Sequence, residues 1–540
     1  MLKYQKRFVS RILVLLLALL FLAGCSQKEP AGTESQATSQ AAVEETTAGN
    51  KIVNEPLTLT YFVELEGTKQ APVFSDLSKS NLYKELEKRT GITIKFVHPT
   101  SGQATDQLNL MILSGDYPDI IENMDYPGGT LKAYEDGIIV RISDYMNELP
   151  NLSKVLSEHP KWDKELKDDA KNIFAFPFIR GDEAMVWTSG PILRKDWLDK
   201  LGLSVPETMD DWYTVLKAFR EKDPNGNGKK DEIPFTYVNA ESYMLRVFSG
   251  AYNLVDVDWC VENGKVDFGP YKPAYKDYLT TLNKWYAEGL LDPDFAAQDW
   301  DTQDAKIFGG TAGAWIGGII GMGETESVAK EKIPGFELVA APYAVLNKGE
   351  VNKCKGTGTL WESVVISAKN EHLKETLKWL DYGYSEEGNM LYNFGIEGES
   401  YAMENGYPKY TDLITKNPNG LPMSQAMSLY MKSHLSGPFV QRIEYLEQVL
   451  SNDNQRDALA LWGKAESSMS YSGSRTTEEN TIFQPIKVNC ETYMQEMRIK
   501  FIMGEADLSK FDEYITKLKD MKMEEANAIK QAGYDRYLAR

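Results

Sequence analysis

The chain has 540 residues, of which 79 are Asp or Glu and 59 are Lys or Arg, giving a formal net charge of −20. Such an acidic protein is a poor partner for nucleic acid or another polyanion. The length, together with an aromatic content of 11%, predicts two lobes with separate cores rather than one domain.

The N-terminal residues have the pattern of an export signal. Four basic residues precede an apolar run from Ile12 to Leu22, which is too short to span a bilayer comfortably. The sequence Leu22-Ala23-Gly24-Cys25 resembles the lipobox of bacterial lipoproteins, which implies a signal peptide at 1–24 and a lipid on Cys25. A signal peptide cut elsewhere and an uncleaved anchor remain alternatives. Because residues 1–24 carry four positive and no negative charges, their removal would change the net charge to −24.

A flexible tether is expected after the signal, in residues 25–54. Ser26 to Asn50 consists largely of Ser, Thr, Ala, Gln, Glu and Gly, with almost no bulky apolar side chain. Such a segment cannot bury a core. With Cys25 as the lipid attachment point, the folded part would begin near residue 55.

The first folded residues predict alternating strands and helices. Apolar and polar residues alternate in Leu57–Val63, which predicts a strand. Helical spacing of the apolar residues predicts a helix over Asn81–Thr90 that ends at Gly91, and the next strand is predicted at Ile92–Val97. A short helix, Gln107–Leu113, and a short buried strand, Asp119–Ile121, follow. This order predicts an α/β fold.

The stretch from Asp223 to Pro234 has the ligand spacing of a calcium loop. Asp223, Asn225 and Asn227 occupy positions 1, 3 and 5 of an EF-hand pattern, and Lys229 at position 7 offers its carbonyl. The loop is shortened, because Asp231 and Glu232 stand at positions 9 and 10 and no glutamate occupies position 12. Six or seven oxygen ligands suit Ca²⁺ better than Mg²⁺. The alternative is a solvated turn rich in Asn, Gly and Asp.

Other metal and catalytic motifs are missing from the sequence. Cys260, Cys354 and Cys490 have neither zinc spacing nor a disulfide pattern, and the four histidines are scattered. The chain has no Gly-x-Ser-x-Gly elbow, no His-Glu-x-x-His motif and no phosphate-binding loop of the Walker type. An enzyme would have to use an unrecognised carboxylate pair, as a glycoside hydrolase does.

Several motifs together resemble the extracellular solute-binding proteins of family 1, in their large Gram-positive lipoprotein branch. The resemblance covers nearly the whole mature chain, and the motifs occur in the expected order. They are residues 110–121, 134–139, 174–178, 194–202, 285–290, 394–401, 511–515 and 534–537.

This resemblance implies a two-lobed clamshell of the periplasmic-binding-protein type II, in which α/β lobes joined by hinge strands close over a ligand. The hinges would lie near Ala184–Pro191 and Thr359–Ser367. The implied division is lobe 1 at 55–187 and 361–400, and lobe 2 at 188–360 and mainly at 401–540.

The resemblance also assigns residues to two sites. In members similar to alginate-oligosaccharide binders it implies a structural Ca²⁺ held by side-chain oxygens of the loop and by the Lys229 carbonyl. Aromatic and polar residues would line the ligand cleft, although burial in a hinge core, or for Arg194 an ion pair, remains an alternative. The calcium residues are Asp223, Asn225, Asn227, Lys229, Asp231 and Glu232, and the cleft residues are Asn123, Tyr126, Trp187, Arg194, Tyr243, Trp315 and Trp361.

The function implied is that of the substrate-binding lipoprotein of an ABC importer. It would be a monomer on the outer face of the bacterial cell membrane, bind an oligosaccharide between its lobes and deliver it to the permease subunits. Trp315, after a Gly-rich turn, would stack on a sugar ring. A sensor or scaffold lipoprotein of the same fold is the main alternative, and a glycoside hydrolase is a further one.

Overall fold

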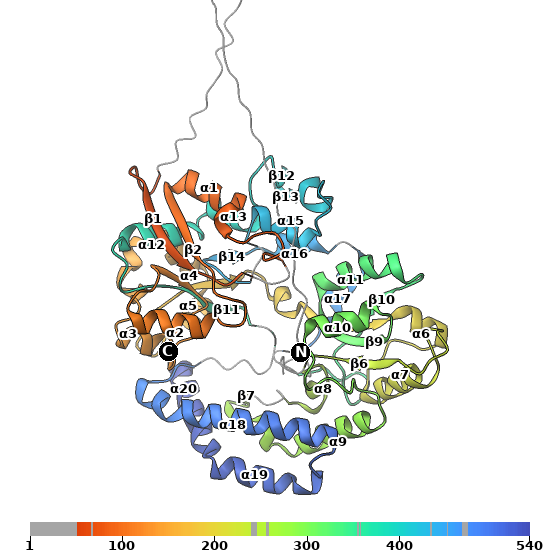
Figure 1. The fold of residues 1–540 in the computed structure, drawn as a ribbon. Coiled ribbons are helices and arrows are strands. Elements are labelled where there is room, and N and C mark those ends of the chain that lie inside the picture. Colours follow the sequence, from red (N-terminus) through yellow and green to blue (C-terminus); the bar gives the residue numbers. More distant parts are fainter. Residues whose placement is uncertain are drawn as a thin grey trace, which may run out of the picture. The chain divides into compact units, whose positions relative to one another are not determined.

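The computed structural model contains two mixed β-sheets, each at the centre of one lobe (Figure 1). It describes residues 51–65, 69–238, 246–254, 259–353, 356, 358–432, 435–450, 452–466 and 473–540. The expected lipid attachment at Cys25, the tether and Tyr243 lie outside the described residues. Within these ranges, no helix has the length and apolar character needed to cross a membrane.

The sheet of lobe 1 has six strands in the order β14-β4-β11-β3-β1-β2. All strands are parallel except β11, which runs antiparallel to both of its neighbours. The carboxyl ends of the parallel strands, including Glu122, Arg180 and Gln441, therefore lie on one edge of the sheet. The strands are β1 (Leu57–Phe62), β2 (Ile92–Val97), β3 (Ile120–Glu122), β4 (Phe176–Arg180), β11 (Leu360–Ile366) and β14 (Phe439–Gln441).

The early elements follow the sequence pattern closely. Helix α1 (Asn81–Thr90) has the predicted bounds, because Ser80 caps its first turn and Gly91 takes a left-handed conformation with φ of 79° after its end. Strands β1 and β2 are confirmed within one residue. Helix α2 (Ala104–Ser114) begins three residues before the predicted Gln107, because the polar first turn carries no apolar periodicity.

The sheet of lobe 2 has four strands in the order β10-β5-β9-β6. Strand β9 is rich in glycine and alanine, and a Cβ at Gly313 would lie 2.6 Å from the ring of Phe219. These small residues let helices pack closely on the strand. The strands are β5 (Ser189–Arg194), β6 (Ile233–Thr236), β9 (Ala312–Gly318) and β10 (Leu338–Ala340), and β6 runs parallel to β9.

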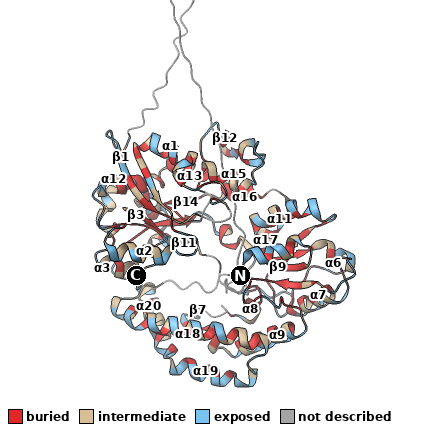
Figure 2. Ribbon diagram, in the orientation of Figure 1, coloured by how far each residue is buried: buried red, intermediate tan, exposed pale blue. Residues whose placement is uncertain are grey.

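Helices cover both sheets, with their apolar faces buried and their polar faces in water (Figure 2). Around the lobe 1 sheet lie α1, α2, α3 (Gly129–Glu135), α4 (Pro150–Glu158), α5 (Pro160–Leu166), α12 (Leu373–Tyr382) and α13 (Glu386–Phe394). Lobe 2 contains α6 (Lys195–Leu201), α7 (Met209–Glu221), α8 (Arg246–Ser249), α9 (Pro273–Ala287), α10 (Trp300–Phe308), α11 (Ile319–Lys332), α16 (Ile443–Val449) and α17 (Asp453–Trp462).

The remaining elements lie between these groups or at the C-terminus. The hairpin β12 (Tyr401–Glu404)–β13 (Tyr407–Tyr410) and helices α14 (Asp412–Thr415) and α15 (Met423–Tyr430) follow α13. The hairpin β7 (Trp259–Glu262)–β8 (Lys265–Phe268) packs against the C-terminal helices, which are α18 (Thr477–Met503), α19 (Phe511–Asp520) and α20 (Met523–Ala539).

In the described ranges, the chain crosses between the two sheets at three places. The first crossing, between β4 and β5, lies close to the expected hinge at Ala184–Pro191. The second precedes β11, which occupies most of the expected hinge Thr359–Ser367. The third follows β14, because Phe439–Gln441 pairs with β4. A three-residue strand has too short a pattern to be recognised, and its pairing is non-local.

The C-terminal helices also contact lobe 1. They pack mainly on α9 and β8 of lobe 2. At their ends, the Arg536 guanidinium pairs with Asp169 and with Glu479, and the Asn480 amide donates to the Gly128 carbonyl over 3.2 Å. The two lobes are therefore joined by side-chain contacts as well as by the three crossings.

We expect Gly190→Ala to weaken the fold at the start of β5. A Cβ there would lie 2.4 Å from Cε2 of Trp462, whose buried indole nitrogen donates to the Ala341 carbonyl over 2.9 Å. Overpacking should lower the free energy of unfolding by about 1–3 kcal/mol, measured by urea denaturation.

The matched control for this prediction is Gly321→Ala in α11. No atom lies within 4 Å of a Cβ at this position. Its stability should stay unchanged or rise by about 0.5–1 kcal/mol, because alanine favours a helix interior. Equal stabilities of the two variants would contradict the proposed packing of Trp462 on Gly190.

Candidate ligand-binding site

A pocket of about 540 Å³ lies between the two sheets. Lobe 1 contributes Arg180 and Gln441, at the carboxyl ends of β4 and β14, and lobe 2 contributes the end of β9 and the start of α11. The carboxyl edges of open α/β sheets are where such folds bind ligands. The volume falls within the range of small-molecule sites.

Two tryptophans of lobe 2 form the aromatic part of the pocket. Trp300, the first residue of α10, is 43% exposed, whereas Trp315 in β9 lines the wall and is only 3% exposed. An exposed indole face can stack on the C–H face of a sugar ring. Trp315 is one of the cleft residues predicted from the sequence, whereas Trp300 is not. The Asp299 cap before Trp300 indicates a helix start, but only the fold places that start beside the pocket.

The polar lining comes mainly from α10, α11 and the loop after β1. Gln303 and Asp304 follow Trp300 on α10, Glu324 lies on α11, and Lys69 belongs to lobe 1. Partial removal from water raises the pKa of Asp304, and the neighbouring negative charge of Asp301 raises it further. The lining thus combines aromatic surface with hydrogen-bonding groups, as a sugar site requires.

The lobe 1 wall is built by Arg180, Trp361 and Leu435. The buried Arg180 guanidinium donates to the Met185 carbonyl and lies 5.4 Å from the ring centre of Trp361. Trp361 in turn donates its indole N–H to the Leu435 carbonyl over 3.2 Å. Arg180 and Leu435 line the pocket, and Trp361 supports them.

A buried ion pair holds the segment that carries Leu435. The Lys432 ammonium lies 3.0 and 2.8 Å from the two carboxylate oxygens of Glu122, and the side chains are 2% and 0% exposed. The hydroxyls of Tyr61 and Ser436 also donate to Glu122. A buried ion pair fixes one arrangement of its partners, because either charge alone would be strongly disfavoured.

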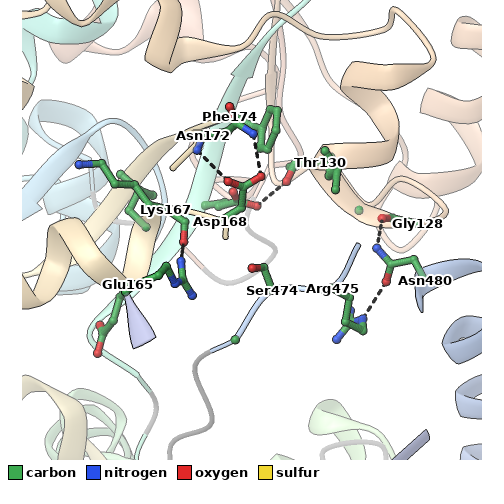
Figure 3. A pocket seen from close by; sticks show the side chains of 16 residues that line it. Gly128, Thr130, Glu165, Lys167, Asp168, Asn172, Phe174, Ser474, Arg475 and Asn480 are labelled. Atoms are coloured by element: carbon green, nitrogen blue, oxygen red, sulfur yellow. Dashed lines mark hydrogen bonds between the residues drawn. The ribbon is translucent and has the colours of Figure 1, made fainter. Parts of the chain in front are cut away.

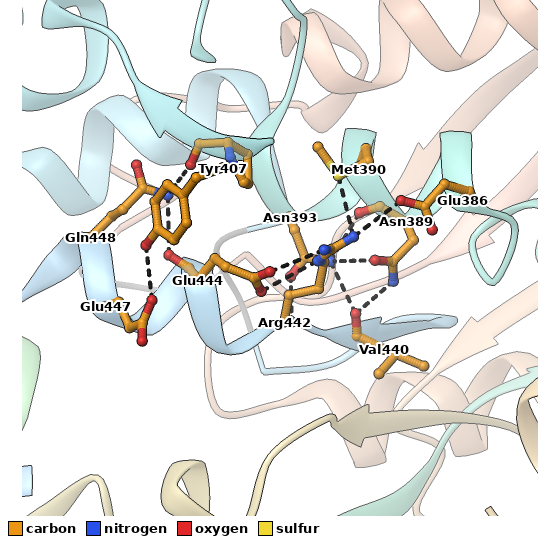
Figure 4. A network of polar contacts seen from close by, with 11 residues as sticks. Glu386, Asn389, Met390, Asn393, Tyr407, Val440, Arg442, Glu444, Glu447 and Gln448 are labelled. Atoms are coloured by element: carbon orange, nitrogen blue, oxygen red, sulfur yellow. Dashed lines mark hydrogen bonds and ion pairs between the residues drawn. The ribbon is translucent and has the colours of Figure 1, made fainter. Parts of the chain in front are cut away.

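A polar network fixes helix α16 after the third crossing (Figure 4). Arg442 donates to Glu444 over 3.0 and 3.3 Å and to Glu386 of α13 over 3.2 Å. The backbone N–H of Arg442 donates to Asn393 over 2.9 Å. These contacts position α16, whose Tyr445 and Leu446 line the pocket.

The other predicted cleft residues lie elsewhere. Trp187 is buried, with its ring centre 5.9 Å from that of Tyr343. Arg194 is buried between the rings of Trp197 and Phe336 and donates twice to Asp196, over 2.8 and 2.6 Å. Both therefore serve the interior of lobe 2.

Asn123 and Tyr126 follow β3 as expected but do not line this pocket. Asn123 is exposed, with φ of 52°, and its backbone N–H donates to the Ser363 carbonyl over 2.7 Å. The Tyr126 hydroxyl donates to Asp136 over 2.9 Å. Of the predicted cleft residues within the described part of the chain, Trp315 lines the pocket and Trp361 supports its wall.

A second pocket, of about 270 Å³, lies between α3, α5, β11 and the start of α18 (Figure 3). Its lining is mostly polar, and the Thr130 hydroxyl donates there to Glu362 over 2.9 Å. Among the described residues of this lining, Phe174 is aromatic and none is Trp or Tyr. The larger pocket is therefore the better candidate for sugar stacking.

The predicted calcium residues come together in one loop of lobe 2. Asp223 accepts the backbone N–H groups of Asn227 and Gly228, each over 3.1 Å. The side-chain amides of Asn225 and Asn227 donate to Asp231 over 3.0–3.1 Å and lower its pKa. The side chains of positions 1, 3, 5 and 9 are thus close neighbours.

Glu232 provides the test of whether this loop fits a cation. It is 4% exposed, and its Oε1 is buried and accepts no hydrogen bond from the described residues. Burial raises the pKa of Glu232, and the charges of Asp223 and Asp231 raise it further. A buried carboxylate oxygen without a donor, beside the charges of Asp223 and Asp231, is compatible with a hard divalent cation.

Across the described ranges, this loop included, no group of three or more His, Cys, Asp or Glu residues is arranged to hold a metal ion. Cys260 and Cys490 are free and buried, and burial raises the pKa of each thiol to about 11. Cys354 lies outside the described residues.

The model of the bacterial extracellular solute-binding proteins matches residues 69–390, more than half of the chain. The chain belongs to this family. The expected family, the two-lobed α/β fold and a binding rather than an enzymatic role are thereby confirmed.

Two curated proteins are similar over most of their length. The fructooligosaccharide ABC transporter substrate-binding protein FusA of Streptococcus pneumoniae serotype 4 is 27% identical over 495 residues, 86% of this chain and 88% of FusA. Lipoprotein LipO of Bacillus subtilis is 28% identical over 462 residues, 82% of this chain and 87% of LipO.

Solved structures agree with the fold. Alginate-binding protein AlgQ2 without calcium ion has a TM-score of 0.75 and 25% identity, covering 90% of this chain and 99% of AlgQ2. FusA in complex with kestose has a TM-score of 0.73 and 25% identity, covering 89% of this chain and 99% of FusA. An EF-hand mutant of FusA, in complex with fructo-nystose, is equally similar.

We expect Lys432→Met to destabilise lobe 1, because it leaves the Glu122 carboxylate buried without a counter-charge. The free energy of unfolding should fall by about 3–5 kcal/mol, measured by urea denaturation. Adding Glu122→Gln should restore most of this loss, because glutamine carries no charge and can accept from one of the Tyr61 and Ser436 hydroxyls while donating to the other.

Lys88→Met is the control for an exposed pair. Lys88 is 76% exposed and lies 3.1 Å from Glu85. Its loss should change stability by less than about 1 kcal/mol. If Lys432→Met were as stable as the Lys88 variant, the Glu122 pair would not hold the pocket wall.

Proposed function

We propose that the chain is the substrate-binding lipoprotein of an ABC importer and that it captures an oligosaccharide between its lobes. The observation that carries this proposal is the pocket at the carboxyl edges of both sheets, with Trp300 exposed within it. The sugar-binding relatives support it, because FusA is a fructooligosaccharide-binding protein and AlgQ2 an alginate-binding protein.

Ligand binding would act by shifting the balance between open and closed lobes. A ligand can shift such an equilibrium only by its different affinity for the two states. A sugar held by Trp300 of lobe 2 and by the Arg180 wall of lobe 1 contacts both lobes when they approach, so it favours closure. The closed form is then the state that the permease subunits recognise, and a separate ATPase drives transport.

Attachment to the membrane would use Cys25. The lipobox pattern Leu22–Cys25 and the similarity to lipoprotein LipO support lipid anchoring. A diacylglycerol carries two acyl chains, which is enough for stable attachment. The tether would leave the monomeric binding domain free to meet the permease from the outer face of the cell membrane.

We expect Trp300→Ala to weaken sugar binding by about 1–3 kcal/mol, judged from the burial of a large apolar side chain. Because Trp300 is 43% exposed, the melting temperature should change little. Isothermal titration calorimetry against a panel of oligosaccharides measures the affinity, and thermal unfolding measures the stability.

Two further variants distinguish an effect on sugar stacking from an effect on the stability of the fold. Trp300→Phe keeps an aromatic face and should lose less affinity than Trp300→Ala. Trp315→Ala should reduce both affinity and stability, because this side chain is 3% exposed. Unchanged affinity in Trp300→Ala would remove that residue from the site, and release of shorter sugars from the ligand would replace the transport function with hydrolysis.

We also propose that the loop of Asp223 to Glu232 holds a structural Ca²⁺. Side-chain oxygens of Asp223, Asn225, Asn227, Asp231 and Glu232 would hold the ion, with the Lys229 carbonyl. The bound charge would neutralise the carboxylates and fix the loop between α7 and β6. None of these residues lines the sugar pocket, so the ion would stiffen lobe 2 without contacting the sugar.

Chelation should therefore lower the stability of the protein without abolishing sugar binding. An ion that binds only the folded state at 100–1,000 times its Kd contributes about 3–4 kcal/mol. Thermal unfolding with and without a chelator measures this difference. Asp223→Ala with Asp231→Ala should make the protein insensitive to the chelator.

The matched control removes two exposed aspartates elsewhere. Asp412→Ala with Asp453→Ala takes away the same charge from side chains that are 77% and 91% exposed. This variant should keep the chelator sensitivity of the unmodified protein. An Asp223 and Asp231 variant that stayed equally sensitive would show that calcium binds at another site.

A further inference from the structure

We propose that the pocket selects neutral, hydroxyl-rich oligosaccharides and rejects polyuronates. This inference rests on the proposed function and names the ligand class of the same site. The relatives leave the choice open, because FusA is a fructooligosaccharide-binding protein and AlgQ2 binds alginate, a polymer of uronic acids. The side chains that line the pocket decide between the two.

The side-chain amide of Gln303 is buried, and its oxygen has no hydrogen-bond donor among the described residues. It lines the pocket and is 2% exposed, and its Oε1 accepts no hydrogen bond from any described residue. An unpartnered buried polar atom is unfavourable, so a ligand that supplies a donor gains affinity. A sugar hydroxyl both donates and accepts, and it satisfies the amide in either orientation. A carboxylate only accepts, so Gln303 favours a hydroxyl over a carboxylate as its neighbour, although hydroxyls are present in neutral and acidic sugars alike.

The spacing on α10 brings this amide close to the aromatic surface. Gln303 follows Trp300 by three residues, so the two side chains lie on the same face of the helix. A sugar ring stacked on Trp300 can therefore direct a hydroxyl towards Gln303. The same helix face thus serves the apolar and the polar parts of one sugar unit.

Two carboxylates add acceptors to the same lining. Asp304 is exposed on α10, and Glu324 is half-buried on α11. Both accept hydrogen bonds from hydroxyl groups, and both repel a ligand carboxylate. The acidic chain as a whole, with a net charge of −20, adds to this repulsion.

The positive charges of the lining do not outweigh its negative charges. Among the described residues, the lining has two cations, Lys69 and Arg180, against the two carboxylates. Arg180 is 3% exposed and already donates to the Met185 carbonyl while lying over Trp361. A site for polyuronates needs guanidinium groups that present a free fork to each carboxylate. The described lining has no such excess of positive charge.

The test is calorimetry of the purified protein with neutral and acidic sugars of matched length. The neutral probes are kestose, nystose and maltotriose, and the acidic probes are trigalacturonate and an alginate trisaccharide. We expect at least one neutral sugar to bind ten or more times tighter than either acidic sugar. An acidic sugar that bound equally or more tightly would overturn this inference and leave the proposed function intact. Binding of neither class would overturn both.

Variants then test the residues that carry the argument. Asp304→Asn with Glu324→Gln should reduce the preference for neutral sugars at least tenfold, because the repulsion is removed. Gln303→Leu should lower the affinity for the neutral sugar at least fivefold while the melting temperature stays equal or rises, because leucine fills the space without an unpartnered atom. An unchanged preference in the first variant, with unchanged affinity in the second, would contradict the assignment.

Discussion

The polarity of the strands constrains every residue of the candidate pocket. In lobe 1, β3, β4 and β14 are parallel, so Glu122, Arg180 and Gln441 share one edge of the sheet. In lobe 2, the parallel pair β6 and β9 ends beside the start of β5. Because the first crossing joins the end of β4 to the start of β5, these two edges face the same pocket. Side chains from distant parts of the sequence meet there because the strands that carry them end or begin at this edge of each sheet.

Buried polar contacts complete this arrangement. The Glu122–Lys432 pair fixes the segment after α15 against lobe 1, and the Arg442 network fixes the start of α16 after the third crossing (Figure 4). The Glu122–Lys432 pair need not contribute much net stability, because desolvation offsets much of the attraction between buried charges. Their effect is to specify one position for Leu435 and for Tyr445 at the pocket. A purely apolar contact would permit neighbouring arrangements of similar energy.

The two proposed ligands have separate tasks in this structure. The loop of Asp223 to Glu232 stands between α7 and β6, away from the pocket lining, and a cation there would stabilise one lobe as a rigid body. Closure about hinges is effective only when each lobe moves as a unit. The sugar pocket, in contrast, draws residues from both lobes. Rigidity within a lobe and movement between lobes can therefore be provided by different residues.

The sequence by itself determined the features that depend on neighbouring residues. Helix α1 ends at Gly91 because a left-handed conformation is needed there, and β1 and β2 alternate as half-buried strands do. The loop of Asp223 to Glu232 also depends on local turns, which bring the side chains of Asp223, Asn225, Asn227 and Asp231 together. The motifs along the chain also identified the family, which the match over residues 69–390 confirms.

Only the tertiary structure decided which residues line the candidate pocket. Trp187, Trp315 and Arg194 all stand at plausible positions in the sequence, yet two are buried within lobe 2 and one lines the pocket wall. Trp300 and Gln303 carry no motif, and the three-residue strand β14 is too short to be recognised. The physical reason is that a side chain's exposure depends on what packs against it. Some of the packing partners, such as Tyr343 for Trp187 and Phe336 for Arg194, come from elements more than a hundred residues away.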